Sequence, residues 1–289
     1  MLEDKLVHTL AQKHHDDHEM TGEDYDDLKH QQEMEEELYE DDEMEEEAED
    51  VPEMELLAMM DAEEDSLHVV RRLFYSGADL VSIETKLLGR NALASLREQG
   101  FVWLDGLFDG DVIQAAREAA LQLAESGEMI PAGMVRLEDD PFRDRKARDD
   151  VICWLHKDQH PATHPALDAV LDKLQLIQRD IASVIRLKGQ AEYQLAVYKG
   201  NGGHYERHRD AFPIDDDADE EQRRVTVVVY LTDELETNVG GGLKIFRPLG
   251  HEQIVESAAG RVMIFLSGVV DHEVLPVFNM RAAVSAWIR

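Results

Sequence analysis

The feature that most constrains this sequence is the uneven distribution of its acidic residues. The chain of 289 residues contains 63 Asp and Glu against 29 Lys and Arg. Residues 1–66 hold 28 of the acids and three lysines, a net charge of −25, which leaves −9 for residues 67–289. Like charges at this density repel one another, and the segment has too little apolar surface to offset the entropy of ordering. The sequence therefore predicts a disordered acidic extension over 1–66.

The extension contains a low-complexity run, Glu33–Asp50, and one apolar stretch, Met54–Met60 (MELLAMM). A short apolar stretch of this kind can form a helix on a partner, although a transient helix in an acidic tail is the simpler interpretation. The charge of the extension suits a basic partner. One hypothesis is therefore that the extension is an interaction module.

Composition also argues against several classes of protein. No window approaches the roughly 20 consecutive apolar residues that a membrane helix requires, and the first residues lack the basic-then-apolar pattern of a signal peptide. The acidic balance disfavours binding to nucleic-acid phosphates. Cys153 is the one cysteine, which excludes an internal disulfide and is typical of a reducing compartment. We expect a cytoplasmic protein, or a nuclear one in a eukaryote, that binds neither membranes nor nucleic acid.

The pattern of residues 67–289 predicts one domain with a mainly β fold. Two helices are expected, at Asp111–Ser126 and at Pro165–Ile185, where apolar residues recur three and four apart. Turn-separated strands without βαβ alternation favour an antiparallel sandwich or jelly roll with packed helices. We expect helical support and the first strands over 67–190 and the core over 191–289. The predicted strands are 101–104, 151–155, 193–198, 225–231, 242–246, 261–266 and 282–288.

The pattern His-x-Asp starts at four positions, which are His14, His15, His156 and His208. Residues two apart on an extended segment face the same side, so each pair can present an imidazole nitrogen and a carboxylate oxygen to one metal ion. The first two pairs lie in the charged extension, where a solvated surface is the simpler interpretation. His156 has no third ligand with suitable partners downstream. For His208 and Asp210, the later residues His272 and Arg281 supply such partners.

Two histidines and one carboxylate on one face leave three coordination positions open, as in non-haem Fe(II) oxygenases. Two open positions accept a chelating 2-oxo acid and one accepts O2. Arg281 stands nine residues after His272, at the start of a predicted strand. Its planar, permanently charged guanidinium suits the distal carboxylate of such an acid, whereas a surface salt bridge would be the default interpretation of this arginine alone.

Five segments carry a common pattern. They are YKGNGGHYERHRD (198–210), RRVTVVVYLT (223–232), GGGLKIF (240–246), RVMIFLS (261–267) and the stretch from HEVLP through Arg281 to Trp287 (272–287). Together they resemble the Fe(II)/2-oxoglutarate dioxygenases of the prolyl 4-hydroxylase superfamily, and specifically the hypoxia-inducible-factor prolyl hydroxylase type. The resemblance covers most of residues 92–289 and none of the acidic extension. It implies a double-stranded β-helix of the jelly-roll or cupin type with helices packed on one sheet, which agrees with the strands predicted above.

Carried over by position, the resemblance implies roles for individual residues of this sequence. The implied iron ligands are His208, Asp210 and His272. The implied contacts of 2-oxoglutarate are Arg281 and Tyr230 at its distal carboxylate, Tyr198 beside its chelating end, and Leu243 and Trp287 along the pocket, although the last two would be buried in any sandwich.

Three further features follow from the same resemblance. Arg148 is implied at the substrate entrance. Asp150 and Arg223 are implied to form an ion pair between strands. The polar segment Met134–Ala147 corresponds to a mobile loop that closes over the substrate in the family.

The resemblance implies an enzyme that uses Fe(II), 2-oxoglutarate and O2, with ascorbate as reductant. The implied reaction hydroxylates a prolyl residue of a target protein at C4, with succinate and CO2 as co-products and a role in oxygen sensing. Asp210 favours hydroxylation, because the halogenating branch has a small residue at that position. Two alternatives stay open: a 2-oxoglutarate oxygenase for another side chain or a small molecule, and an iron- or O2-sensing protein that works through its acidic extension.

Overall fold

The computed structural model describes residues 66–75, 84–132, 148–156, 164–213, 220–232, 240–247 and 251–289. All of these belong to the compact unit Glu53–Arg289. The predicted disorder of the extension, the apolar stretch Met54–Met60 and the loop predicted at 134–147 therefore concern residues outside the described ones, with the exception of Ser66.

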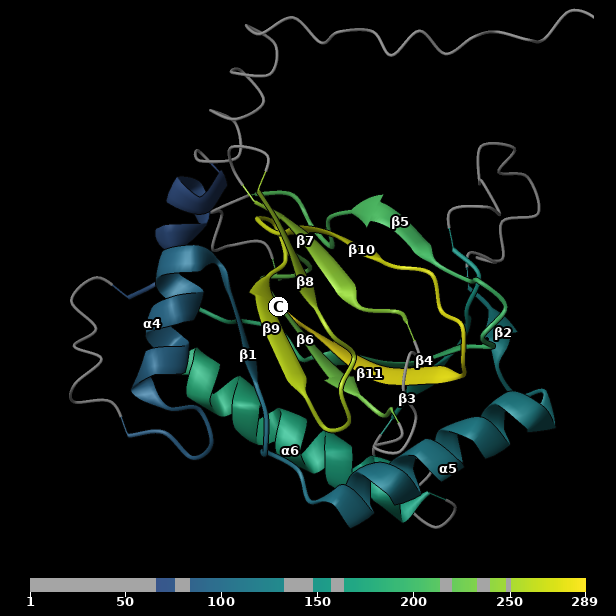
Figure 1. The fold of residues 1–289 in the computed structure, drawn as a ribbon. Coiled ribbons are helices and arrows are strands. Elements are labelled where there is room, and N and C mark those ends of the chain that lie inside the picture. Colours follow the sequence, from purple (N-terminus) through teal and green to yellow (C-terminus); the bar gives the residue numbers. More distant parts are fainter. Residues whose placement is uncertain are drawn as a thin grey trace, which may run out of the picture. The chain divides into compact units, whose positions relative to one another are not determined.

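Two antiparallel sheets build the fold (Figure 1). The larger sheet has the strand order β1-β9-β6-β11-β4-β3-β2, and the smaller has the order β5-β10-β7-β8. The mainly β, double-stranded β-helix fold expected from the sequence is confirmed. The strands are β1 (Phe101–Leu104), β2 (Ile130–Pro131), β3 (Val151–Leu155), β4 (Glu192–Tyr198), β5 (Tyr205–His208), β6 (Val225–Tyr230), β7 (Leu243–Arg247), β8 (His251–Val255), β9 (Val262–Leu266), β10 (Asp271–Val274) and β11 (Arg281–Ile288).

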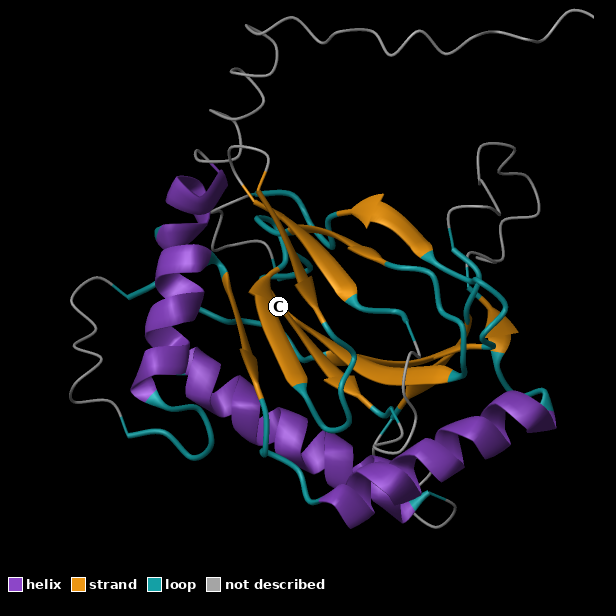
Figure 2. Ribbon diagram, viewed as in Figure 1, coloured by secondary structure: helices purple, strands orange, loops and turns teal. Residues whose placement is uncertain are grey.

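Three helices, α4 (Arg90–Gln99), α5 (Gly110–Ser126) and α6 (Pro165–Ala182), run along the outer face of the larger sheet (Figure 2). Residues 66–71 are also helical. Successive side chains of a strand point to opposite faces, so every second residue of the larger sheet packs against the helices. Within the described residues, no helix combines the length and the apolar character needed to cross a membrane. The strand residues of this helix-facing core include Leu195, Val197, Val225, Val227, Val229, Val262, Ile264, Ala282, Val284 and Ile288.

The other face of the larger sheet looks toward the smaller sheet and forms a second, smaller apolar cluster. It contains alternate residues of the same strands together with residues of the smaller sheet and its connections. Packed side chains fill most of the helix-facing side, and the inner side encloses the cavity described below. The cluster comprises Phe101, Tyr198, Val228, Tyr230, Leu243, Ile245, Val255, Met263, Phe265, Val270, Val274, Val277 and Ala283.

The predicted elements are confirmed with shifts at their ends. The helix expected at Asp111–Ser126 is α5, and the helix expected at Pro165–Ile185 is α6, which ends at Ala182. The seven predicted strands are all present, displaced by at most one residue at either end. The helix α4 and the strands β2, β5, β8 and β10 were not predicted. The four strands are short or charged, whereas the buried residues Ala92, Leu93 and Leu96 of α4 recur three and four apart and were a usable signal.

One buried carboxylate joins α6 to the segment that precedes α4. Asp180, which is 3% exposed, accepts three backbone hydrogen bonds. Its Oδ1 receives the N–H of Lys86 at 2.7 Å, and its Oδ2 receives those of Leu87 and Leu88 at 2.7 and 2.8 Å. Backbone N–H groups buried without a partner are costly, so this single side chain secures a segment that no strand or helix ladder holds.

We predict that Asp180→Ala lowers the free energy of unfolding by about 3 kcal/mol, because hydrogen bonds to a charged group contribute about 1.5–3 kcal/mol and three donors lose their acceptor. Denaturant unfolding of the variant and the wild type measures the difference. Glu118→Ala is the control, since Glu118 accepts an exposed hydrogen bond from Gln114 and surface changes stay within about 0.5 kcal/mol. Equal stability of the Asp180 variant and the wild type would contradict the prediction.

Candidate metal centre

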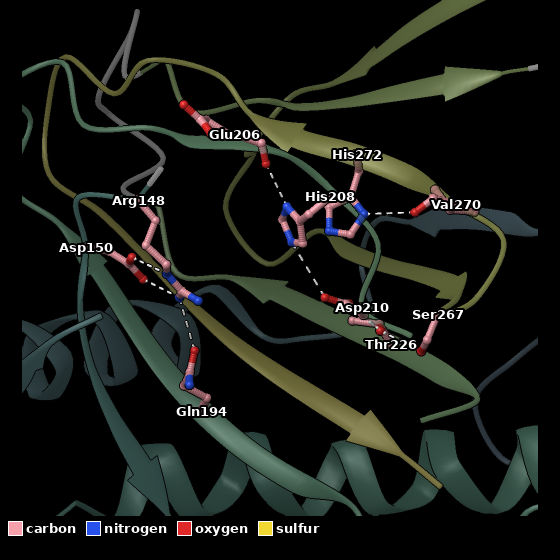
Figure 3. Close-up of polar contacts among 10 residues, drawn as sticks. All are labelled: Arg148, Asp150, Gln194, Glu206, His208, Asp210, Thr226, Ser267, Val270 and His272. Carbon is pink, nitrogen blue, oxygen red and sulfur yellow. Dashed lines mark hydrogen bonds and ion pairs between the residues drawn. The ribbon is translucent and has the colours of Figure 1, made fainter. Parts of the chain in front are cut away.

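Three side chains on the inner side of the sheets form a cluster with the composition of a metal site. His208 ends β5, Asp210 follows two residues later, and His272 lies on β10. In the β5–β10 ladder His272 is the direct partner of His208. One ligand atom of each residue lies within 4.8 Å of the others, and Figure 3 shows the three side chains turned toward one another. In the described part of the chain this is the one group of this kind.

Backbone carbonyls orient both imidazole rings. His208 Nδ1 lies 2.7 Å from the carbonyl oxygen of Glu206, and His272 Nδ1 lies 3.0 Å from that of Val270 (Figure 3). A carbonyl only accepts, so each Nδ1 carries the proton and each Nε2 keeps its lone pair for a metal. Burial lowers the pKa of His272, and this favours the neutral ring that a metal ligand requires.

Two hydroxyl groups fix the carboxylate. Thr226 Oγ1 donates to Asp210 Oδ2 at 2.6 Å and lies 2.8 Å from Ser267 Oγ. Asp210 Oδ1 lies 3.6 Å from His208 Nε2, so this oxygen is the one turned toward the histidines. Burial acts to raise the pKa of Asp210, but His208, His272 and the hydrogen bond from Thr226 lower it by more, to well below its usual range. The carboxyl group is therefore ionised and ready to bind a cation.

The cluster opens into a cavity of about 330 Å³ between the two sheets. Its walls combine alternate residues of β3, β4, β6 and β11 with residues of β5, β7 and β10. Of the nine residues that the sequence assigns to the site, eight line this cavity. They are Arg148, Tyr198, His208, Asp210, Leu243, His272, Arg281 and Trp287.

Tyr230 is the one member of this set that does not reach the cavity surface directly. It is fully buried next to Arg281, whose guanidinium carbon lies 5.1 Å from the centre of the Tyr230 ring and 5.2 Å from that of Tyr198. Tyr198 is the direct strand partner of Arg281. The sequence-based assignment therefore brings eight residues to the cavity wall and one immediately behind it.

Arg281 and Tyr230 have polar atoms that the described residues leave without a hydrogen-bond partner. These atoms are Arg281 Nε and the Tyr230 hydroxyl, and both are inaccessible to solvent. Burial raises the pKa of Tyr230, so its hydroxyl keeps the proton and is a donor. A buried cation beside a buried O–H donor is suited to a carboxylate, and the cavity is where a carboxylate ligand can enter.

A turn of two glycines packs closely against the side chain of Arg281. Gly240 and Gly241 have φ values of 72° and 65°, in the left-handed region that other residues rarely adopt. A Cβ atom on Gly241 would lie 2.4 Å from Arg281 Cδ. The glycine run before β7 therefore allows the backbone to approach the arginine closely.

Arg148 lies at one side of the cavity in a network of its own (Figure 3). Its Nε and Nη2 donate to the two oxygens of Asp150 at 2.6 and 2.7 Å, and Nη2 also donates to Gln194 Oε1 at 3.3 Å. Its guanidinium carbon lies 4.4 Å from the centre of the Tyr205 ring. This ring in turn stacks on His208, with 3.7 Å between ring centres.

The predicted ion pair between Asp150 and Arg223 is wrong. The carboxylate of Asp150 is bidentate with Arg148, which is close because residues two apart on an extended segment face the same side. Arg223 instead pairs with Glu192 at 3.2 Å and lies over the Trp287 ring at 4.2 Å.

Sequence reasoning missed several residues around the cluster. Thr226 belongs to β6, where Thr226, Val228 and Tyr230 share the inner face, so the strand period was a usable signal for it. Ser267 follows the end of β9 and carries no such signal. His156, the third His-x-Asp histidine, lines a separate cavity of about 200 Å³ between β3, α5 and α6.

Comparison with known sequences gives a match over the part of the chain that carries the site. The profile of the 2OG-Fe(II) oxygenase superfamily matches residues 193–289. This stretch includes every residue of the His208, Asp210 and His272 cluster as well as Arg281. Residues 193–289 are thus similar to a 2OG-Fe(II) oxygenase domain. Members of this superfamily use Fe(II), 2-oxoglutarate and O2, and the donor set of the cluster fits such an iron.

Curated relatives of the oxygenase domain are prolyl hydroxylases. The chain is 25% identical over 239 residues to the hypoxia-inducible factor prolyl hydroxylase of Caenorhabditis elegans. This alignment covers 78% of this chain and 31% of that protein. It is 26% identical over 196 residues to Egl nine homolog 1 of Rattus norvegicus, and this alignment covers 66% of this chain and 56% of that protein. The chain thus spans about a third to just over half of the length of these relatives.

Solved structures share the fold of the oxygenase domain. A Pseudomonas putida prolyl-4-hydroxylase matches with a TM-score of 0.58 and 27% identity, over 69% of this chain and 97% of that one. A Trichoplax adhaerens prolyl hydroxylase, in complex with a hypoxia-inducible factor peptide fragment, matches with a TM-score of 0.57 and 22% identity, over 68% of this chain and 86% of that one.

We predict that Thr226→Val weakens Fe(II) binding about 10-fold or more, because loss of an outer hydrogen-bond partner of a metal ligand lowers metal affinity about 10- to 100-fold. Valine keeps the shape of threonine and removes the hydroxyl that holds Asp210. Anaerobic equilibrium titration with Fe(II) measures the affinity. Thr226→Ser keeps the donor and serves as the control, and unchanged affinity in the valine variant would refute the role of this hydrogen bond.

Proposed function

We propose that this chain is an Fe(II)- and 2-oxoglutarate-dependent dioxygenase that hydroxylates a prolyl residue of a target protein at C4 in the cytoplasm. The observation that carries the proposal is the coexistence of two features in one cavity. The first is the cluster of His208, Asp210 and His272. The second is the buried pair of Arg281 and Tyr230, whose Nε and hydroxyl have no hydrogen-bond partner among the described residues.

The proposed roles follow from the chemistry of these groups. His208, Asp210 and His272 hold the iron through two Nε2 atoms and one carboxylate oxygen. Arg281 and Tyr230 bind the distal carboxylate of 2-oxoglutarate, an acceptor that satisfies both buried groups. When bound, iron with 2-oxoglutarate and O2 supplies an oxidative decarboxylation that puts one oxygen atom into succinate and the other into a substrate C–H bond.

The walls of the cavity serve the reaction by excluding water and by limiting what can reach the metal. Tyr198, Leu243 and Trp287 are buried and line the space around the proposed cosubstrate. At the side of β2 and β3, the lining residues Ile130 and Trp154 are 48% and 41% exposed. We propose that this side, with Arg148, is where the substrate enters.

The similarity to prolyl hydroxylases supports a prolyl substrate. The most informative structural match is the Pseudomonas putida prolyl-4-hydroxylase, because it is 27% identical and almost fully covered. The named substrate of the curated Caenorhabditis elegans relative is hypoxia-inducible factor. We propose a proline-containing protein as the substrate class of this chain.

We also propose that three parts of the sequence have separate roles. Residues 191–289 supply the catalytic core, and residues 67–190 supply helical support and the first strands. The extension 1–66, with a net charge of −25, is proposed to bind a basic partner. Removal of 1–66 tests this division: loss of partner binding with intact peptide turnover supports it, whereas loss of turnover contradicts it.

The first test is anaerobic titration of the protein with Fe(II) and then with 2-oxoglutarate. Chelation of iron by a 2-oxo acid produces a weak visible charge-transfer band, which we expect in the wild type and not in His272→Ala. Bound iron without this band would contradict the proposed cosubstrate. Incubation with O2 and a library of proline-containing peptides then tests the substrate, and oxygen incorporated at a residue other than proline would contradict that part of the proposal.

We predict that Arg281→Ala raises the KM for 2-oxoglutarate at least about 30-fold, because loss of one partner of a buried charge pair costs about 2 kcal/mol or more. Iron affinity stays close to that of the wild type, since Arg281 is not a ligand in the proposed site. Tyr230→Phe removes only a hydroxyl and raises the KM less, by about 10-fold at most. Steady-state assays of succinate formation give both values, and an unchanged KM in Arg281→Ala would exclude the proposed contact.

A further inference from the structure

The carboxylate of Asp271 binds the two arginines that lie on either side of His208 in the sequence. Asp271, directly before His272, accepts Arg207 Nη2 at its Oδ2 and Arg209 Nε at its Oδ1, both at 2.6 Å. Arg207 and Arg209 are the residues on either side of His208. The three side chains therefore connect the two histidine-bearing segments by two charge-assisted hydrogen bonds.

The segment that carries His208 is held by its ladder with β10 and by one isolated β-bridge, between Tyr205 and Arg148. The strand β5 is at the edge of its sheet and consists of four residues, and among the named strands it pairs with β10 (Figure 1). Its register is irregular, because His272 faces His208 whereas Val274 faces Tyr205. Two steps along β10 therefore correspond to three steps along β5. Such a bulge interrupts the ladder at the point where the position of a metal ligand has to be fixed.

The outer ends of both arginines are also held. The guanidinium carbon of Arg207 lies 4.2 Å from the centre of the Phe246 ring, on β7, where Phe246 is the strand partner of Asp271. Arg209 Nη1 donates to Ser66 Oγ at 3.3 Å, and this residue opens the helical segment 66–71. The cluster of Asp271, Arg207 and Arg209 thus extends from the middle of the smaller sheet to a helix.

We infer that Asp271 is a positioning residue, which holds His208 and His272 in register for metal binding by clamping Arg207 and Arg209. The inference rests on the proposed iron site. Asp271 touches neither the metal nor a substrate in this scheme, and it acts through the two strands. The side chain is 16% exposed, so water screens its ion pairs only in part.

The test compares Fe(II) affinity by anaerobic titration, the visible spectrum of the Co(II)-loaded protein, and thermal unfolding. Asp271→Asn keeps the shape of the side chain and removes its charge, and Arg209→Gln removes the same contact from the other side. We expect each variant to bind Fe(II) about 10-fold more weakly, the magnitude seen when outer partners of a metal site are lost. We also expect an altered Co(II) spectrum, which a loss of stability alone would not produce.

A double-mutant cycle sharpens the result. If one interaction is responsible, Asp271→Asn combined with Arg209→Gln loses little more affinity than either variant alone. Asp105→Asn is the matched control, because Asp105 accepts two hydrogen bonds from Arg261 at 2.8 and 3.0 Å on the other sheet, away from the histidines. We expect this control to bind Fe(II) like the wild type.

Two results would overturn the inference, and they are distinguishable. Wild-type Fe(II) affinity and Co(II) spectra in both Asp271→Asn and Arg209→Gln would overturn the positioning role while leaving the proposed function intact. Absence of Fe(II) binding by the wild type would overturn the proposed function and the inference together. If Asp271→Asn does not fold, Arg209→Gln and Arg207→Gln carry the test alone.

Discussion

The pairing of β10 with β5 is the constraint on which the rest of the site depends. It places His272 directly opposite His208, with 4.3 Å between the ring centres, although the two residues are far apart in the sequence. Asp210 joins them because it follows His208 by two residues. The other elements hold this pair in place: β7 supports β10 from its second side, and Thr226 on the larger sheet fixes the carboxylate from across the cavity.

Alternate side chains of the larger sheet have different roles, because one set packs against the helices and the other set lines the cavity. On β11, Ala282, Val284, Ala286 and Ile288 pack toward the helices, whereas Arg281, Ala283, Ser285 and Trp287 line the cavity. The same division holds on β4 and β6. A substitution on the helix-facing side therefore alters the packed core, whereas one on the other side alters the cavity, although the two positions are adjacent in the sequence. One-residue slips of these strands are excluded for the same reason.

The sequence predicts those parts of the fold and site whose signals are local. Strands such as Val225–Tyr230 are rich in β-branched residues, and α5 and α6 have long apolar stripes, so the sequence predicts these elements. The strands β5, β8 and β10 are short and charged, as in Tyr205–His208, and showed no comparable pattern. The predicted ion pair of Asp150 with Arg223 was wrong because a nearer arginine, Arg148, donates to both oxygens of the Asp150 carboxylate. The contact of Asp271 with Arg207 and Arg209 depends on a bulged register, which no local pattern encodes.

Polar groups around the cavity fall into two kinds, and the difference separates scaffold from binding site. Asp150, Arg148 and Gln194 satisfy one another, and Thr226 with Ser267 holds one oxygen of Asp210, so these contacts fix positions. The other oxygen of Asp210 is turned toward the histidines. Arg281 Nε, the Tyr230 hydroxyl and Trp287 Nε1 are buried without a hydrogen-bond partner among the described residues. A fold that leaves such groups unsatisfied bears a cost that an incoming acceptor removes. Hydrogen bonds to a bound acceptor would therefore stabilise these groups, which lie around Arg281.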